Sequence, residues 1–265
     1  MTVVRAAALS ALTLACAPFA PSIAGCAPEP REPVMVIGHR GAPLVAIENS
    51  IESFRAAKAQ GADGVELDVA LTADGVDVVM HDELLDRTTT CTGAVRDRTV
   101  EGLGGCRLKN GEPVRTLEAV LAEIGPEFRL IFVELKVFDG RAVAQADDVV
   151  AQVLRSGHAA KVVASSYDAT ANIRLAARQS EGIIAGWDAT TNEALSRATE
   201  HGARWALMPF RALGGREGDL ARGTGKELAV YVVASAADFA WAYDAGVRVM
   251  MTDTVPLLRA VVAGD

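Results

Sequence analysis

From residue 34 to the C-terminus, short runs of apolar and β-branched residues alternate with longer segments whose apolar residues recur at helical spacing. This alternation is typical of parallel strands connected by helices. The strand-like runs are 34–38, 64–70, 76–80, 130–135, 161–165, 182–186, 204–208, 228–233 and 247–252. The clearest helical patterns cover 48–60, 116–124, 145–156, 168–179, 191–202, 235–245 and 254–263. An eight-stranded barrel would leave one of these strands to be placed elsewhere.

The strand left over is 76–80. It follows 64–70 too closely to be its parallel neighbour, because a crossover needs about a dozen residues. The turn residues Ala73, Asp74 and Gly75 lie between the two segments, so we expect a β-hairpin. Eight parallel strands remain. Residues 34–265 are therefore predicted to form a (β/α)8 TIM barrel of the α/β class with a hairpin extension after its second strand.

The N-terminus has the composition of a targeting segment. Residues 1–26 contain one charge, Arg5, then a long Ala- and Leu-rich run and small residues, which is typical of a secretory signal peptide. The alternative is a hydrophobic first helix. Ile23, Ala24 and Gly25 precede Cys26 and resemble the lipobox of bacterial lipoproteins, which implies lipidation of Cys26.

The chain is thus expected to be exported, to the periplasm or the cell surface, and held to the membrane by a lipid anchor alone. No later apolar run reaches membrane-spanning length. Residues 27–33 are rich in proline and are predicted to be a tether.

Two more cysteines, Cys91 and Cys106, lie 15 residues apart in a segment without clear periodicity. Export favours a disulfide between them, stapling an insertion over 82–115. Closing a loop of this length gains about 3 kcal/mol in the chain-entropy model. The alternative is a pair of separate buried thiols.

The charge balance bears on the class of partner. The chain has 26 Lys and Arg against 34 Asp and Glu, a formal net charge of −8. Proteins that bind nucleic-acid phosphates as their main task carry an excess of basic residues, so no nucleic-acid partner is expected.

Carboxylates stand where a barrel places its catalytic groups. Glu66 and Asp68 are two residues apart on one predicted strand, so they share a face, while Val65, Leu67 and Val69 fill the other. Two inward carboxylates cost several kcal/mol unless a cation or a proton neutralises them. A divalent metal would meet this need.

Other strand ends bring further charged residues to the same face. A hairpin centred on Asp74 places Asp68 opposite Met80 and His81. The strand 130–135 leads into Glu134 and Lys136, and the first strand ends at His39 and Arg40. The C-terminal ends of barrel strands converge, so these side chains should meet.

The predicted set has two imidazoles for acid–base work, three carboxylates suited to Mg²⁺ or Ca²⁺, and two cations suited to a phosphate. Its members are His39, His81, Glu66, Asp68, Glu134, Arg40 and Lys136. Each has a structural alternative: Glu66 and Asp68 could form salt bridges with Lys136 and Arg40, and His39 could be a core histidine.

At these residues the sequence resembles the glycerophosphodiester phosphodiesterase family. The matching segments are His39-Arg40-Gly41 with Glu48-Asn49-Ser50, 61–69, Asp74-Gly75 leading to Val79-Met80-His81-Asp82, Glu134-Leu135-Lys136, Ser165-Ser166-Tyr167 and Met251-Thr252-Asp253. Two departures are Ile47, where the family usually has Pro, and 230–234, where Val-Tyr-Val-Val-Ala replaces a Val-Trp-Thr-Val-Asn pattern.

The resemblance implies a barrel enzyme that cuts glycerophosphodiesters into sn-glycerol 3-phosphate and an alcohol with a divalent metal. It assigns metal binding to Glu66, Asp68 and Glu134, acid–base catalysis to His39 and His81, and phosphate contact to Arg40 and Lys136. We expect His39 to be the base and His81 the acid. Direct attack by water and a cyclic phosphate intermediate both remain open.

Three further residues have two interpretations each. Glu48 could orient His39 or the metal ligands, or cap the helix 48–60. Phe210 and Tyr231, near strand ends, could pack against the glycerol or be structural. The competing functions are a phospholipase of the D or phosphatidylinositol-specific type, and a surface lipoprotein that binds a ligand without turnover.

Overall fold

The computed structural model describes residues 33–264. The predicted signal peptide, Cys26 and nearly all of the predicted tether lie outside this range. None of the helices between residues 33 and 264 has both the length and the apolar character needed to cross a membrane.

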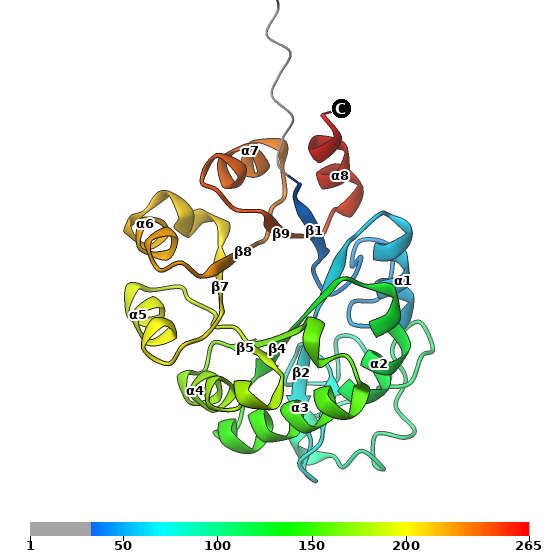
Figure 1. Ribbon diagram of the computed structural model, residues 1–265. Helices are drawn as coiled ribbons and strands as arrows, with labels where there is room; N and C mark the ends of the chain where they lie inside the picture. The colour runs from blue at the N-terminus through cyan, green and yellow to red at the C-terminus, as the bar shows by residue number, and fades with distance from the viewer. Residues whose placement is uncertain (1–32, 265) are drawn as a thin grey trace, which may run out of the picture. The chain divides into compact units, whose positions relative to one another are not determined.

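Eight parallel strands form the predicted barrel (Figure 1). Around the barrel the order is β6-β5-β4-β2-β1-β9-β8-β7. Their bounds are β1 Met35–Gly38, β2 Gly64–Leu71, β4 Leu130–Lys136, β5 Val162–Ser166, β6 Ile184–Ala185, β7 Trp205–Pro209, β8 Glu227–Tyr231 and β9 Val249–Thr252. A parallel bridge between Asp188 and Leu207 joins the β6 side to β7, and Leu207 donates a backbone hydrogen bond to Trp187 O at 2.9 Å.

The helices surround the strands (Figure 1). They are α1 Ile51–Ala59, α2 Leu117–Ile124, α3 Ala142–Ser156, α4 Ala169–Ala177, α5 Asn192–Glu200, α6 Arg216–Gly223, α7 Ala236–Asp244 and α8 Val255–Ala263. Short 3-10 turns cover Val95–Asp97, Gly125–Glu127, Ala159–Lys161, Gln179–Glu181 and Phe210–Gly214. All seven predicted helices are confirmed. Helix α6 was not predicted, because its short sequence contains two glycines and little apolar periodicity.

Capping side chains fix where several helices begin. The side chains of Ser50, Thr116, Asp168, Thr191 and Ser235 each accept a hydrogen bond from the backbone N–H three residues later. Such caps satisfy an N–H that the helix itself leaves free. Helix α1 therefore starts after Ser50, three residues later than the predicted start at Glu48.

The period-two pattern of the strands separates two apolar layers. Val65, Leu67 and Val69 of β2 pack outward against the helices. A second cluster fills the barrel interior, where Phe132 meets Trp205 edge to face with ring centroids 5.4 Å apart. The β2 side chains that alternate with these valines and leucine point into the barrel. They include Glu66 and Asp68, as predicted.

The predicted hairpin is confirmed in type and in register. Strand β3, Asp77–Val79, pairs antiparallel with β2 through Val69 with Val79 and Leu71 with Asp77. Met80 N donates to Asp68 O at 3.0 Å. The hairpin therefore brings the residue after Met80, His81, to the end of β2.

The insertion over 82–115 packs on this hairpin around its own small apolar cluster, which includes Leu85, Val95, Leu103 and Cys106. A disulfide joins Cys91 to Cys106, with Cα atoms 5.6 Å apart. The predicted pairing is confirmed.

Candidate active site

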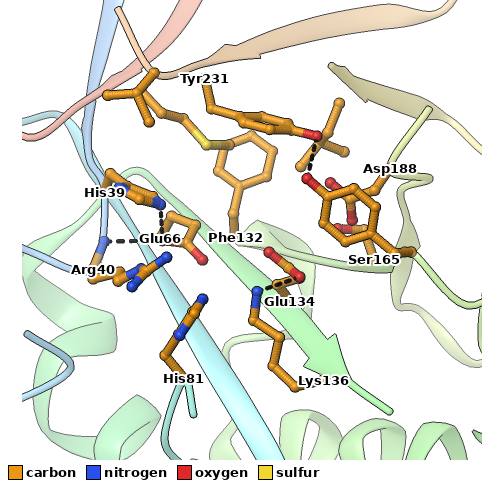
Figure 2. A pocket seen from close by; sticks show the side chains of 14 residues that line it. His39, Arg40, Glu66, His81, Phe132, Glu134, Lys136, Ser165, Asp188 and Tyr231 are labelled. Carbon is orange, nitrogen blue, oxygen red and sulfur yellow. Dashed lines mark hydrogen bonds and ion pairs between the residues drawn. The ribbon is translucent and has the colours of Figure 1, made fainter. Parts of the chain in front are cut away.

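A cavity of about 270 Å³ opens at the C-terminal ends of the barrel strands. Figure 2 shows His39, Arg40, Glu66 and His81 on one side of it and Ser165 and Asp188 on the other, with Phe132 between them. The lining residues are His39, Arg40, Glu66, His81, Phe132, Glu134, Lys136, Ser165, Tyr167, Asp188, Leu207, Tyr231, Val232 and Met251. The structure thus brings six of the seven predicted polar residues to one cavity, and the seventh, Asp68, lies beside them.

Glu66, Asp68 and Glu134 form a compact acidic cluster. Each offers one oxygen within 4.8 Å of the others. Glu66 and Asp68 are buried, Glu66 Oε1 accepts no hydrogen bond from the described residues, and Asp68 Oδ1 has only the ion pair with Lys136 Nζ. Burial and the charge of Asp68 raise the pKa of Glu66 to about 8.

This donor set fits a hard divalent cation. Three carboxylate oxygens from two adjacent strands, with Glu66 Oε1 accepting no hydrogen bond from the described residues, provide the ligand type that Mg²⁺ and Ca²⁺ prefer. The salt-bridge alternative is also partly realised: Lys136 Nζ lies 3.1 Å from Asp68 Oδ1 and 2.5 Å from Glu134 Oε1. Although burial opposes ionisation, Lys136 and Arg40 hold the pKa of Asp68 below its usual value.

Asn49 holds Asp68 in place through two hydrogen bonds. Its Nδ2 donates to Asp68 Oδ2 at 2.8 Å, and its Oδ1 accepts from the Asp68 backbone N–H at 3.1 Å. Asn49 has a φ of 59°, in the left-handed region that asparagine tolerates better than most residues. Sequence reasoning gave Asn49 no role. Its place directly after Glu48 in the matching segment was the available signal.

The Arg40 backbone is fixed from several directions. Arg40 has a φ of 54°. Its N–H donates to Glu66 Oε2 at 2.9 Å, and its carbonyl accepts from Asn49 N at 3.1 Å and from Ser53 Oγ at 3.0 Å. These contacts maintain a costly backbone conformation that directs the guanidinium into the site.

His39 is oriented by Asp253. The His39 Nδ1 atom lies 2.7 Å from Asp253 Oδ1, and Nε2 lies 3.9 Å from Glu66 Oε2. Burial lowers the pKa of His39, but the hydrogen bond to Asp253 and the charge of Glu66 outweigh it, so the pKa is raised. Asp253 directly follows β9 and belongs to a matching segment to which the resemblance assigned no role, so the sequence analysis missed its function.

His81 has an equivalent partner in the next residue. Its Nδ1 atom lies 2.7 Å from Asp82 Oδ1, and Arg87 Nε donates to Asp82 Oδ2 at 2.5 Å. The hydrogen bond from Arg87 lowers the pKa of Asp82 to about 2. Both histidines therefore have one ring nitrogen bound to an aspartate and the other available to a substrate.

Glu48 connects the two sides of the site. It accepts from Arg87 at 2.7 and 2.6 Å and from Arg40 NH1 at 3.2 Å. The capping interpretation of Glu48 is wrong, because the Ser50 side chain caps α1. The structure places Glu48 beside Arg40 rather than beside His39.

The two aromatic predictions have different outcomes. Tyr231 lines the cavity, and its hydroxyl lies 2.7 Å from the Tyr167 hydroxyl. Phe210 does not line it: the chain turns into a 3-10 helix after Pro209, and Phe210 packs edge to face on Trp241 with centroids 5.9 Å apart. The expectation that Phe210 contacts substrate is corrected, because the turn after β7 carries it toward α7.

A family model described as the glycerophosphoryl diester phosphodiesterase family matches residues 39–257. The chain belongs to this family. The resemblance stated from the sequence motifs is therefore confirmed.

Several relatives of this family match part of the chain. A glycerophosphodiester phosphodiesterase of Caldanaerobacter subterraneus is 43% identical over 109 residues, 38% of this chain and 45% of that protein. Glycerophosphodiester phosphodiesterase 1 of Bos taurus is 40% identical over 117 residues, 41% of this chain and 35% of that protein. The chain thus spans less than half the length of the curated relatives it matches.

Solved structures support the fold over most of the chain. A glycerophosphodiester phosphodiesterase from Agrobacterium tumefaciens has a TM-score of 0.73 at 26% identity, covering 86% of this chain and 99% of that one. An Oleispira antarctica phosphodiesterase, solved in complex with the product sn-glycerol-3-phosphate, has a TM-score of 0.77 at 20% identity, covering 86% and 96%.

Proposed function

We propose that this chain hydrolyses glycerophosphodiesters to sn-glycerol 3-phosphate and an alcohol, with a divalent metal. One observation carries the proposal: two imidazoles, each bound through Nδ1 to an aspartate, flank one buried carboxylate cluster beside Arg40 and Lys136. Family membership and the product named for the Oleispira protein support it.

In this proposal Glu66, Asp68 and Glu134 hold the metal, which when bound supplies a Lewis acid for a phosphoryl oxygen. Arg40 and Lys136 neutralise phosphate oxygens. Burial opposes the charge of Lys136, but Asp68 and Glu134 raise its pKa, so it is cationic at neutral pH. The fixed positions of both cations mean that little reorganisation is needed as charge develops on the phosphate.

The histidines move the protons. His39 Nε2 accepts the proton of the attacking hydroxyl, which belongs either to water or to the glycerol moiety. His81 donates a proton to the departing alkoxide as its phosphorus–oxygen bond breaks. Asp253 and Asp82 fix the tautomer and orientation of the two rings. Arg87 and Glu48 position Asp82 and Arg40.

The test is release of sn-glycerol 3-phosphate from glycerophosphocholine with Ca²⁺ or Mg²⁺. His39→Ala and His81→Ala should each lower kcat by about 10²–10⁴-fold, the usual contribution of a positioned acid or base. His158→Ala is the matched control, since His158 precedes β5 at the opposite end of the barrel and should leave turnover unchanged. Near-normal turnover in either catalytic variant would contradict the mechanism.

A further inference from the structure

The cavity end opposite the histidines holds a fourth carboxylate, the buried Asp188, to which the proposed hydrolysis assigns no role (Figure 2). Its residue is 5% exposed although it lines the cavity, and Oδ2 has no hydrogen-bond partner among the described residues. The backbone around Asp188 is fixed, because its N–H donates to Ser166 O at 3.3 Å and it bridges to Leu207. The backbone therefore fixes the position of Asp188 between the β6 side and β7.

The cations of the site are engaged elsewhere. Lys136 Nζ contacts Asp68 and Glu134, and the Arg40 guanidinium contacts Asp68 and Glu48. Asp188 forms no ion pair within residues 33–264. Burial and the charge of Glu134 raise the pKa of Asp188 well above its usual value, so its neutral form is favoured until a cation comes close and stabilises the carboxylate.

The walls around Asp188 are mainly aromatic and aliphatic, and they include one hydroxyl without a hydrogen-bond partner among the described residues, that of Ser165. Tyr167 and Tyr231 line the cavity and both interact electrostatically with Asp188, and Leu207, Val232 and Met251 also line it. The two tyrosine hydroxyls are hydrogen-bonded to each other at 2.7 Å. A polyol would need several free polar partners, whereas an organic cation needs aromatic faces, apolar surface and one negative group.

We propose that Asp188, with Tyr167 and Tyr231, binds the ammonium group of the substrate's alcohol, so that the chain prefers glycerophosphodiesters of cationic alcohols such as choline. The proposal rests on the proposed hydrolytic function. It makes Asp188 a specificity-determining residue rather than a part of the acid–base or metal machinery. The bound ammonium group supplies the counter-charge that the protein itself does not place beside Asp188.

The test compares glycerophosphocholine with glycerophosphoglycerol, whose alcohol is neutral. Asp188→Asn keeps the shape of the side chain and removes its charge. It should lower kcat/KM for glycerophosphocholine by about 10- to 100-fold, mainly through KM, because a contact made in both ground and transition states changes binding. For glycerophosphoglycerol the change should stay within about threefold. Equal losses on both substrates, or no loss on either, would overturn the proposal.

A second variant tests the proposal even if Asp188→Asn fails to fold. Tyr167 is 53% exposed, so Tyr167→Leu should fold normally. It should lower the ratio of the two kcat/KM values by about threefold or more, the loss of one exposed cation–π contact, and Tyr167→Phe should preserve the ratio. Lys136 Nζ lies 6.0 Å from the Tyr167 ring centre, but an effect through Lys136 would act on both substrates alike and leave the ratio unchanged. An unchanged ratio in Tyr167→Leu would count against the proposal.

Calorimetry with choline alone separates this proposal from the hydrolytic one. If choline binds the wild type but not Asp188→Asn, the ammonium site is supported even if no diester is cut. Release of sn-glycerol 3-phosphate without choline binding or headgroup preference would overturn the ammonium site and leave the hydrolytic function standing.

Discussion

Two groups of buried carboxylates on neighbouring strands of the β2–β3 hairpin are neutralised in different ways. Glu66 of β2 and Glu134 line a cavity, and Asp68 of β2 lies beside them in contact with two cationic side chains. Asp77 of β3 is fully buried and faces α3, where Gln145 Nε2 donates to its Oδ1 at 2.8 Å. The first group is open to a ligand and the second is enclosed by protein.

The enclosed group is completed by amides and a second aspartate. Asp148 Oδ2 accepts from the Asp77 backbone N–H at 2.7 Å and from Gln152 Nε2 at 2.6 Å. Burial, together with the nearby Asp148, raises the pKa of Asp77 well above its usual value, which favours a shared proton over a pair of charges. Burial of a carboxylate is thus common to both regions, and the cavity with fixed cations is what marks the functional one.

The largest difference between the two groups of carboxylates should be in their effect on catalytic activity. Glu66→Gln keeps an oxygen for the Arg40 N–H but removes a charge from the acidic cluster. We expect release of sn-glycerol 3-phosphate to fall by about 10²–10³-fold, the scale measured for losing one preorganised electrostatic group. Asp77→Asn is the matched control and should retain activity within about twofold. Comparable losses in both variants would remove the distinction between the regions.

The next difference should be in stabilisation by cations. At a concentration of 100 Kd, Mg²⁺ or Ca²⁺ should raise the free energy of unfolding by about 2.7 kcal/mol, because the cation binds only the folded cluster. Urea denaturation with and without a chelator measures this. Glu66→Gln should lose most of the gain, and Asp77→Asn should keep it. A cation effect that survives Glu66→Gln would show that the ion binds elsewhere.

The smallest difference should be in the pH dependence of stability. The folded protein holds a proton on Asp77 up to a higher pH than the unfolded chain, whose aspartates have a pKa of about 3.9. The stability from this proton is complete below that value and is lost as pH rises through the folded pKa. Asp77→Asn cannot lose a proton, so its stability relative to wild type should increase from pH 4 to pH 8. Parallel stability curves for the two proteins would contradict this assignment.

Features encoded by local spacing were predictable from the sequence. The period-two pattern of 64–70 placed Glu66 and Asp68 inward, and the turn at Asp74 set the pairing that brings His81 to Asp68. These depend on neighbours along the chain, so one sequence suffices. The start of α1 was placed at Glu48 because Ser50 was not recognised as its cap.

Features that depend on distant segments were not predictable in this way. The partner of His39 is Asp253, 214 residues away. Arg87 reaches Glu48 across 39 residues. The contacts of Arg87 arise because the insertion folds back over the hairpin, and no periodicity in 82–115 indicates that path.

The sequence alone determined the alternating architecture, the hairpin and the charged residues at the strand ends, because side-chain direction follows from position along a strand. Only the tertiary structure decided which group neutralises each charge, that Phe210 turns away from the cavity, and that Asp188 faces it without a cation. The physical reason is that these outcomes depend on atoms a few ångströms apart in space but on separate strands and loops, and sequence spacing does not encode those distances.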